Sequence, residues 1–233
     1  FSIQLFADEA LLGGKPINMA FDARGRLWVS STREYPFAVP KDRWSDPEGT
    51  RAKGSKDSVR ILEDTDGDGH ADKVTVFADE LNLPTGVLPY KNGCIAWSIP
   101  NIWYLEDTDG DGKCDKRRIL FGPLGYERDT HGMISSLRLG LDGWVYATHG
   151  FSNTSHFEVR PENRRKNDEA RMTNDEKGKE EKSTKTANQR QDSSFVIRHS
   201  DLAAENTGQT LDITSGSVFR FRPDGSRVEL WTS

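Results

Sequence analysis

The sequence has little cysteine and no long apolar run. Among its 233 residues there are two cysteines, Cys94 and Cys114, which are too few for a disulfide framework or a cysteine-based zinc site. A single bridge between them and two unrelated thiols both stay open. No stretch approaches the roughly 20 apolar residues that a membrane-spanning helix needs, so we expect no membrane span in this chain.

An excess of positive charge is also missing. The formal net charge is −5 and the sequence pI is about 5.6, which argues against nucleic acid as a partner. The sequence lacks the G-x-S-x-G elbow of serine hydrolases and a strand-to-helix G-x-G-x-x-G for nicotinamide cofactors. It also lacks a C-x-x-C-H segment for covalent haem. It starts at Phe1 rather than Met, which fits a removed signal peptide or a piece of a longer chain.

Polarity is concentrated in one segment. The mean hydropathy of −0.73 is low for a globular domain, and more than half of the residues in 158–193 are charged, with no aromatic among them. Such a segment cannot bury enough apolar surface to offset the entropy lost on ordering. We therefore predict a folded region in 1–157, a charged mobile insertion in 158–193, and a continuation of the fold in 194–233. A lid or docking loop ordered by a partner is the alternative for the insertion.

The remaining sequence is typical of β-strands. Short runs rich in β-branched and aromatic residues alternate with Gly, Asp, Asn and Pro, and no long amphipathic helix is apparent. The predicted class is all-β. The expected strands are Asn18–Phe21, Arg26–Ser30, Val59–Leu62, Lys73–Phe77, Cys94–Ser98, Ile102–Leu105, Arg118–Phe121, Ser135–Leu139, Trp144–Thr148, Ser217–Arg222 and Arg227–Trp231.

An internal repeat indicates the architecture. Ile61–Lys73 reads ILEDTDGDGHADK and Tyr104–Lys116 reads YLEDTDGDGKCDK, at an offset of 43 residues. A period of about 40–50 residues in a strand-rich chain is typical of β-propeller blades, each a four-stranded sheet. We therefore predict propeller blades in 1–157 that continue in 194–233. The number of expected strands is enough for only part of a propeller. A β-sandwich is the alternative fold.

Both repeats carry a D-x-D-x-D-G-x-x-D loop. Alternate carboxylates on a tight loop converge on one point, and hard oxygen ligands in this number favour Ca²⁺. Position 12, where an EF-hand has Glu, holds Thr75 and Arg118, so we predict calcium loops between strands rather than helix–loop–helix sensors. An acidic turn without a metal is the alternative. The predicted ligands of the two calcium sites are Asp64, Asp66, Asp68, Asp72, Asp107, Asp109, Asp111 and Asp115, with main-chain oxygens of His70 and Lys113.

Histidines flank a later strand. His131 comes just before the strand expected at 135–139, where the inner strands of a propeller begin at its central cavity, and a His there can act as a general base. A structural, hydrogen-bonded histidine is the alternative. His149 closes the next strand, and we predict that it and Arg138 flank the same pocket as cofactor-binding candidates.

Five segments resemble a bacterial family of membrane-bound dehydrogenase domains: INMAFDARGRLWVSST, VRILEDTDGDGHADK, FADELNLPTGV, DTHGMISSLRLGLDGWVYATHG and SGSVFRFRPDG. These domains are similar to the soluble quinoprotein glucose and sorbosone dehydrogenases. The resemblance implies a six-bladed β-propeller, only partly contained in this chain, in a periplasmic or otherwise extracytoplasmic location. It also implies the quinone cofactor PQQ, with His131 at the place of the catalytic base. The later basic cofactor-binding residues of those enzymes would follow Ser233.

Two functions follow from these observations. The first is a quinoprotein-like oxidoreductase that oxidises a sugar or polyol hydroxyl and passes electrons to a c-type haem domain or cytochrome. The second is a non-catalytic, calcium-stabilised propeller that binds carbohydrate or protein. Whether the chain is an enzyme is left open by the residues.

Overall fold

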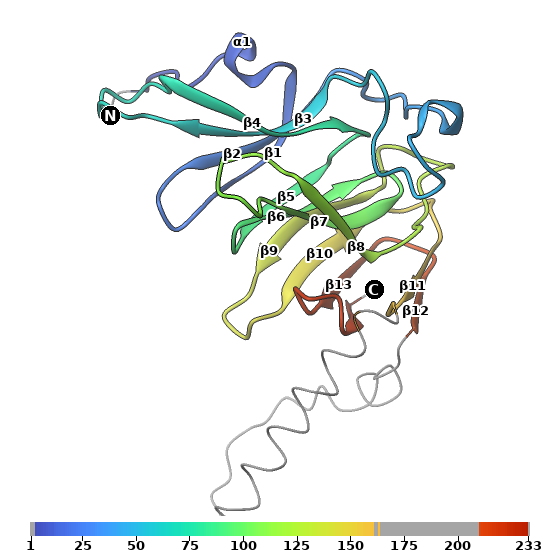
Figure 1. Ribbon diagram of the computed structural model, residues 1–233. Helices are drawn as coiled ribbons and strands as arrows, with labels where there is room; N and C mark the ends of the chain where they lie inside the picture. Colours follow the sequence, from blue (N-terminus) through green and yellow to red (C-terminus); the bar gives the residue numbers. More distant parts are fainter. Residues whose placement is uncertain (1–2, 161–162, 164–209, 233) are drawn as a thin grey trace, which may run out of the picture.

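The computed structural model describes residues 3–160, 163 and 210–232, and this part of the chain is built almost entirely of strands (Figure 1). Its helical elements are the four-residue α1 (Glu9–Leu12) and the 3₁₀ turn Lys41–Arg43. The predicted all-β class is therefore confirmed. No helix in the described ranges is long and apolar enough to span a bilayer. The predicted charged insertion at 158–193 lies, apart from residues 158–160 and 163, outside the described residues.

Twelve of the strands form three antiparallel sheets of four strands each. Sheet 1 contains β1 (Lys15–Phe21), β2 (Leu27–Thr32), β3 (Asp57–Glu63) and β4 (Lys73–Leu81). Sheet 2 contains β5 (Gly86–Tyr90), β6 (Gly93–Ser98), β7 (Asn101–Glu106) and β8 (Lys116–Phe121). In both sheets each strand pairs with the next one along the chain, as short hairpin connections favour.

Sheet 3 follows the same plan with an insertion. It contains β9 (Ile134–Leu139), β10 (Val145–His149), β13 (Ser217–Phe221) and β14 (Val228–Thr232). Between β10 and β13 the chain forms a separate two-stranded sheet of β11 (Ser155–Glu158) and β12 (Thr210–Ile213). In the sequence, these two strands flank residues 159–209, which include most of the predicted charged stretch.

The three sheets follow one another in space and do not close into a ring (Figure 1). Their first strands, β1, β5 and β9, are edge strands, and β5 contacts both β1 and β9. Apolar side chains fill the layers between neighbouring sheets: one cluster includes Trp28, Phe77 and Trp103 from sheets 1 and 2. A larger cluster includes Trp97 and Phe219 from sheets 2 and 3. Face-to-face burial of this kind is the main force that holds the sheets together.

A third apolar layer lies on the other face of sheet 1. Leu27, Val29 and Leu62 pack there against the segment that precedes β1, including Phe6. Phe6 begins the sequence FADE, which recurs at Phe77 in β4. The N-terminal segment therefore covers sheet 1 with the same residues with which β4 of sheet 1 contacts sheet 2.

The two cysteines are free thiols. Cys94 is fully buried in β6, and Cys114 packs against the cluster between sheets 1 and 2. The single bridge that the sequence left open is not formed in this structure. Burial raises the pKa of both thiols, which disfavours the reactive thiolate.

Candidate functional site: two aspartate loops and a histidine-lined cavity

The first aspartate loop connects β3 to β4. Asp64, at its start, accepts hydrogen bonds from the amides of Gly67 and Gly69 at 2.7 and 2.9 Å. Gly69 adopts φ +91°, a conformation that L side chains rarely adopt. At the end of the loop, both carboxylate oxygens of Asp72 accept from the Thr65 amide, and the Thr65 hydroxyl donates to Asp72 Oδ2 at 2.7 Å. The turn therefore folds around its own carboxylates.

The second loop, between β7 and β8, repeats this geometry. Asp107 accepts from the amides of Gly110 and Gly112 at 2.6 and 2.9 Å. Asp115 accepts from the amide and hydroxyl of Thr108 at 2.9 and 2.8 Å. The sequence repeat is therefore a structural repeat down to individual hydrogen bonds.

Three carboxylates converge in each loop. Carboxylate oxygens of the first, third and ninth positions lie within 4.8 Å of one another in both loops: Asp64, Asp66 and Asp72 in the first, and Asp107, Asp109 and Asp115 in the second. Oxygen atoms at such separations can share one cation.

The predicted fourth carboxylate of each loop is outside these groups. Asp68 Oδ1 accepts from the His70 amide at 2.8 Å, and Asp111 Oδ1 accepts from the Lys113 amide at the same distance. Each of these side chains closes the tip of its own turn. The structure therefore brings together three rather than four carboxylates per loop, and the main-chain oxygens of His70 and Lys113 remain predicted ligands.

Hydrogen bonds favour the ionised carboxylates. The amide of Gly69 is the main cause of the lowered pKa of Asp64, and the amide of Thr108 is the main cause for Asp115. Amide donors stabilise the charged form of a carboxyl group and so oppose its protonation. Both loops therefore present charged oxygens, the form that binds a hard cation.

Each loop also docks on the layer next to its own sheet. The amide of Ala71 donates to the carbonyl of Phe6 at 2.8 Å, and the equivalent amide of Cys114 donates to the carbonyl of Phe77 in β4 at 2.6 Å. The Gln4 side chain adds a hydrogen bond to the carbonyl of Asp68 at 3.0 Å. The first loop therefore ties the N-terminal segment to sheet 1, and the second ties sheet 1 to sheet 2.

A separate cavity of about 350 Å³ lies at the start of the inner edge strands. It is lined by side chains from β1, from β9 and from the segments that precede β5 and β9. The lining residues are Ile17, Asn18, Tyr35, Thr85, Thr130, His131, Met133, Ser135 and Ser136. Six of these carry hydroxyl or amide groups. The hydroxyls of Thr85 and Thr130 already donate to main-chain carbonyls and can only accept from a ligand, whereas those of Tyr35 and Ser136 can also donate.

His131 lines this cavity with its ring orientation fixed. The ring Nδ1 lies 3.0 Å from Asp129 Oδ1, and the His131 amide donates to the same oxygen at 2.8 Å. Because an ionised carboxylate only accepts, Nδ1 carries the proton and Nε2 of the neutral ring is left as an acceptor. The His131 amide is the main cause of the lowered pKa of Asp129. The ring of Tyr35 meets the imidazole edge-on, with centroids 5.5 Å apart.

The loop that carries Asp129 and His131 is held by Asn153. This buried side chain donates to the carbonyls of Asp129 and Gly132 at 2.7 and 3.0 Å. It also accepts from the amide of Asp129 at 3.3 Å. The sequence analysis missed both Asp129 and Asn153. Asp129 could have been found from its position two residues before His131, whereas no sequence signal connects Asn153 to this loop.

A β-bulge shapes the wall of the cavity. The pairing of β9 with β10 shifts between Tyr146 and Thr148, and Ser136 adopts φ +57° at this point. Bulges bend a strand locally and re-aim its side chains. The exposed Ser136 is thereby among the cavity-lining residues.

The other two predicted residues lie elsewhere. The His149 ring is 2% exposed; its Nδ1 lies 2.8 Å from the Gly150 carbonyl and its Nε2 2.8 Å from the Ser155 hydroxyl. Arg138 is exposed, pairs with Tyr146 in the sheet, and donates to the Leu137 carbonyl. Neither residue lines the cavity with His131, because His149 faces a buried hydrogen-bond network and Arg138 lies near the opposite end of β9.

The cavity does not fit the quinone implied by the family resemblance. PQQ carries three carboxylate groups, and buried carboxylates need cationic or multiple amide partners. None of the described residues that line the cavity is Lys or Arg. We therefore derive no chemical step through a quinone at this position.

Comparison with known proteins gives one match. A family described as a domain of unknown function (DUF7133) matches residues 1–202. No curated protein and no solved structure matches the chain.

Proposed function

The chain belongs to the DUF7133 family, and we propose that its role is to bind a polyhydroxylated ligand, a sugar or a polyol, in the cavity beside His131. The observation that carries this proposal is the lining of that cavity: hydroxyl and amide side chains surround a histidine whose Nδ1 is bonded to Asp129 and whose Nε2 has no partner among the described residues. Sugar hydroxyls both donate and accept hydrogen bonds and match such a mixed lining.

We propose further that the three sheets are consecutive blades of a β-propeller. Three features support this assignment: the four-stranded meander of each sheet, the contacts of β5 with β1 and β9, and the apolar layers between neighbouring sheets. In a propeller the first strand of each blade lines the central channel. The His131 cavity, at the start of these strands, would then open into that channel.

The aspartate loops are proposed as two calcium sites that stabilise this arrangement. Support comes from the three converging carboxylates of each loop and from the docking of each loop on the neighbouring layer. A divalent cation would neutralise carboxylates that otherwise repel one another. The sites lie in the connections of the outer strands, away from the cavity, so their role would be structural.

Calorimetric titration with D-glucose, D-xylose and sorbitol tests the binding proposal. We expect saturable binding of at least one of them, and a loss of about fivefold to tenfold in affinity for His131→Gln, because one hydrogen bond contributes about 1 kcal/mol. His156→Gln is the matched control: His156 is half-exposed on the β11–β12 hairpin, where it contacts Asp212. Binding that is absent, or equal in both variants, would contradict the proposal.

Oxidation of the bound hydroxyl is the second candidate, because the Asp129–His131 pair could take the hydroxyl proton at Nε2 while the hydride passes to an added quinone that is held by groups other than the cavity lining. For this candidate function we propose an extracytoplasmic location and a c-type haem protein as the electron acceptor. A dye-reduction assay with calcium, PQQ and the same sugars separates the two functions. The leading proposal predicts binding without dye reduction. Reduction that His131→Gln lowers by about two to four orders of magnitude would instead establish an oxidoreductase.

A further inference from the structure

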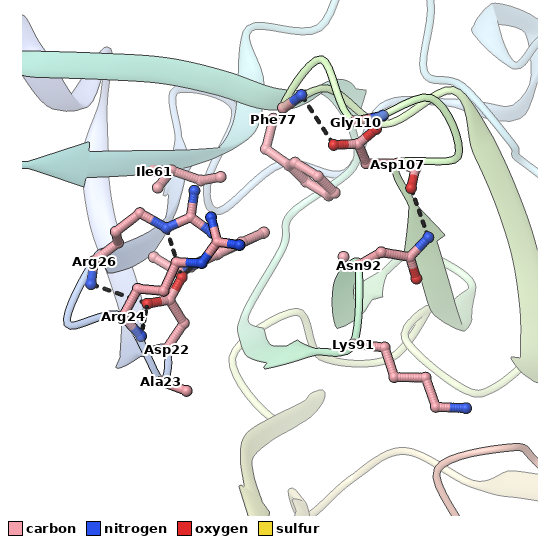
Figure 2. Close-up of a pocket in the computed structure, with 13 residues that line it drawn as sticks. Asp22, Ala23, Arg24, Arg26, Ile61, Phe77, Lys91, Asn92, Asp107 and Gly110 are labelled. Carbon is pink, nitrogen blue, oxygen red and sulfur yellow. Dashed lines mark hydrogen bonds and ion pairs between the residues drawn. The ribbon is translucent and has the colours of Figure 1, made fainter.

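A second pocket opens between sheets 1 and 2, at the opposite ends of β1 and β5 from the His131 cavity. Its volume is about 350 Å³, and its walls come from the β1–β2 turn, the β5–β6 turn and the second aspartate loop (Figure 2). We call it the inter-sheet pocket. It shares no lining residue with the His131 cavity, so whatever it binds is independent of the proposed function.

The floor of the inter-sheet pocket is apolar. Trp28, Ile61 and Phe77 line it from three strands of sheet 1, and each is no more than 3% exposed. The rings of Trp28 and Phe77 meet edge-on with centroids 4.7 Å apart. These buried rings form a rigid base beneath the polar rim and expose almost no surface of their own to a ligand.

One carboxylate on the rim, that of Asp22, accepts hydrogen bonds from the protein at both of its oxygens. Its Oδ1 accepts from the amides of Arg24 and Arg26, and its Oδ2 accepts from Arg26 Nε at 2.7 Å and Trp28 Nε1 at 3.0 Å. Burial opposes the ionisation of Asp22, but hydrogen bonds from Trp28 and Arg26 outweigh it and lower its pKa. The Asp22 side chain is therefore charged and is held in place within the β1–β2 turn.

The second carboxylate, Asp107, is directed into its own loop. Both of its oxygens accept from loop amides, of Gly110 and Gly112. Asn92, from the β5–β6 turn, donates to the Asp107 carbonyl at 2.6 Å and closes that side of the pocket (Figure 2).

Two cations on the rim have no anionic partner among the described residues. The Arg24 guanidinium makes no hydrogen bond or ion pair there, and the Lys91 ammonium contacts only the Tyr90 ring, 5.3 Å from its centroid. Arg26 uses Nε on Asp22 and leaves its terminal nitrogens toward the pocket side of the turn. The pocket lining therefore carries three positive side chains against two carboxylates: Asp22 pairs with Arg26, and Asp107 is bound by the amides of its own loop.

We propose that the inter-sheet pocket binds an anionic monosaccharide, with its acidic group on Arg24 and Arg26 and its hydroxyls toward the β5–β6 turn that carries Lys91. The volume lies at the lower end of the roughly 300–1,000 Å³ of ordinary ligand pockets, which suits a single sugar ring. Guanidinium groups pair well with either a carboxylate or a phosphate.

Calorimetric titrations with D-glucuronate, glucose 6-phosphate and D-glucose test this proposal. They are made at low ionic strength with a chelator present, so that calcium binding by the uronate plays no part. We expect at least one of the two anionic sugars to bind, with affinity falling as salt rises, and D-glucose to bind at least tenfold more weakly in this pocket. Whichever of the two anionic sugars binds more tightly identifies the preferred acidic group as a carboxylate or a phosphate.

Variants locate the site. Arg24→Gln is expected to weaken binding at least tenfold, and Lys91→Asn about threefold, since Lys91 adopts φ +52°, a conformation that Asn tolerates. Lys56→Gln removes the same charge from an exposed position outside the pocket and should change affinity less than twofold. In the complex, the indole N–H signal of Trp28, assigned with Trp28→Phe, should shift. Absence of binding by both acids, equal binding of D-glucose in this pocket, or binding unchanged by Arg24→Gln would overturn the proposal.

Discussion

The buried side chain of Asp57 holds the segment that follows β2 against the segment that leads into β5 of sheet 2. Its Oδ1 accepts from the Thr32 hydroxyl and the Arg33 amide at 2.8 and 2.7 Å, and its Oδ2 accepts from the Leu83 amide at 2.9 Å. Burial raises the pKa of this carboxyl, and the hydrogen bonds offset that effect only in part. Asp57 is fully buried, as are two of its donor residues, Thr32 and Leu83, so water cannot readily replace its carboxylate there.

Replacing Asp57 by Ala should therefore destabilise the protein by roughly 3 kcal/mol, because several buried donors lose their acceptor at once. Urea unfolding measures the change. Asp42→Ala, an exposed carboxylate in the 3₁₀ turn, is the control and should alter stability by less than about 0.5 kcal/mol. A loss below 1 kcal/mol at Asp57 would show that the hydrogen bonds contribute little.

The burial of His149 predicts that the stability of the protein depends on pH. Burial lowers its pKa from the ordinary 6.5, so in the folded protein the neutral ring persists to a lower pH than in the unfolded chain. The unfolded state then binds more protons below about pH 6.5, and stability falls as the pH drops from there toward the lowered pKa. Thermal unfolding at pH 7.5 and 5.5 should show a larger loss for the native protein than for His149→Asn, which cannot take up this proton. Equal losses would contradict the assignment.

Among the elements, the aspartate loops were the most predictable from the sequence. All of their carboxylates lie within nine consecutive residues, so the spacing itself determines which side chains can converge. What the spacing did not show is that Thr65 and Thr108 hold the last carboxylate, or that Asp68 and Asp111 close their own turns. Those details depend on hydrogen bonds that the loop makes only once folded.

Calcium removal should lower the melting temperature by several degrees, because an ion bound only by the folded state stabilises it by about 2.7 kcal/mol at a hundredfold excess over its dissociation constant. Asp66→Asn and Asp109→Asn should each remove part of this response. Their effects should add, since the loops lie in different sheets. Magnesium should replace calcium poorly. Differential scanning calorimetry with and without chelator makes the comparison, and a melting temperature insensitive to calcium would remove the metal assignment.

All eleven strands expected from the sequence are present, because alternating apolar residues between turn signals report local burial. Three strands were missed. β5 contains Pro89 and begins at Gly86, which weakens its pattern but is tolerated on an edge strand. β11 and β12 are four residues each and pair across the charged stretch, so their sequences lack the context that marks a hairpin.

On the scale of the whole molecule, successive layers contact one another in a repeated way. The carbonyl of Phe6 accepts a hydrogen bond from an amide of the first aspartate loop, and the carbonyl of Phe77 accepts the equivalent bond from the second loop. The N-terminal segment thus takes, toward the first aspartate loop, the place that β4 takes toward the second. The sequence repeat alone could not reveal this, because FADE recurs at a different offset from the aspartate loops.

Phe6→Ala should accordingly destabilise the protein by about 2 kcal/mol, since it removes a partly buried ring from the layer over sheet 1. That loss corresponds to roughly 4–8 °C in melting temperature for a protein of this size. Ile3→Ala, at a side chain that is 99% exposed in the same segment, should have almost no effect. Equal effects of the two substitutions would show that the segment does not pack as described.

The His131 cavity was predictable only in part. His131 itself could be selected because it precedes an inner strand, but Asn18, Tyr35 and Thr85 reach the cavity from distant parts of the chain. Their convergence depends on how β1, β5 and β9 are brought together, which no local pattern encodes. For the same reason the sequence misplaced His149 and Arg138.

The central claim is that a sugar or polyol binds beside His131, and chemical-shift mapping by NMR tests it most directly. Sorbitol, or whichever of the three probes binds, is titrated into isotope-labelled protein. The account predicts shifts at Asn18, Thr85 and the His131 ring, with Nδ1 of His131 protonated and Nε2 changing on binding, and no shift at Ser155 beside His149. Shifts confined to other surfaces, or no shifts at all with any of the three probes, would contradict it.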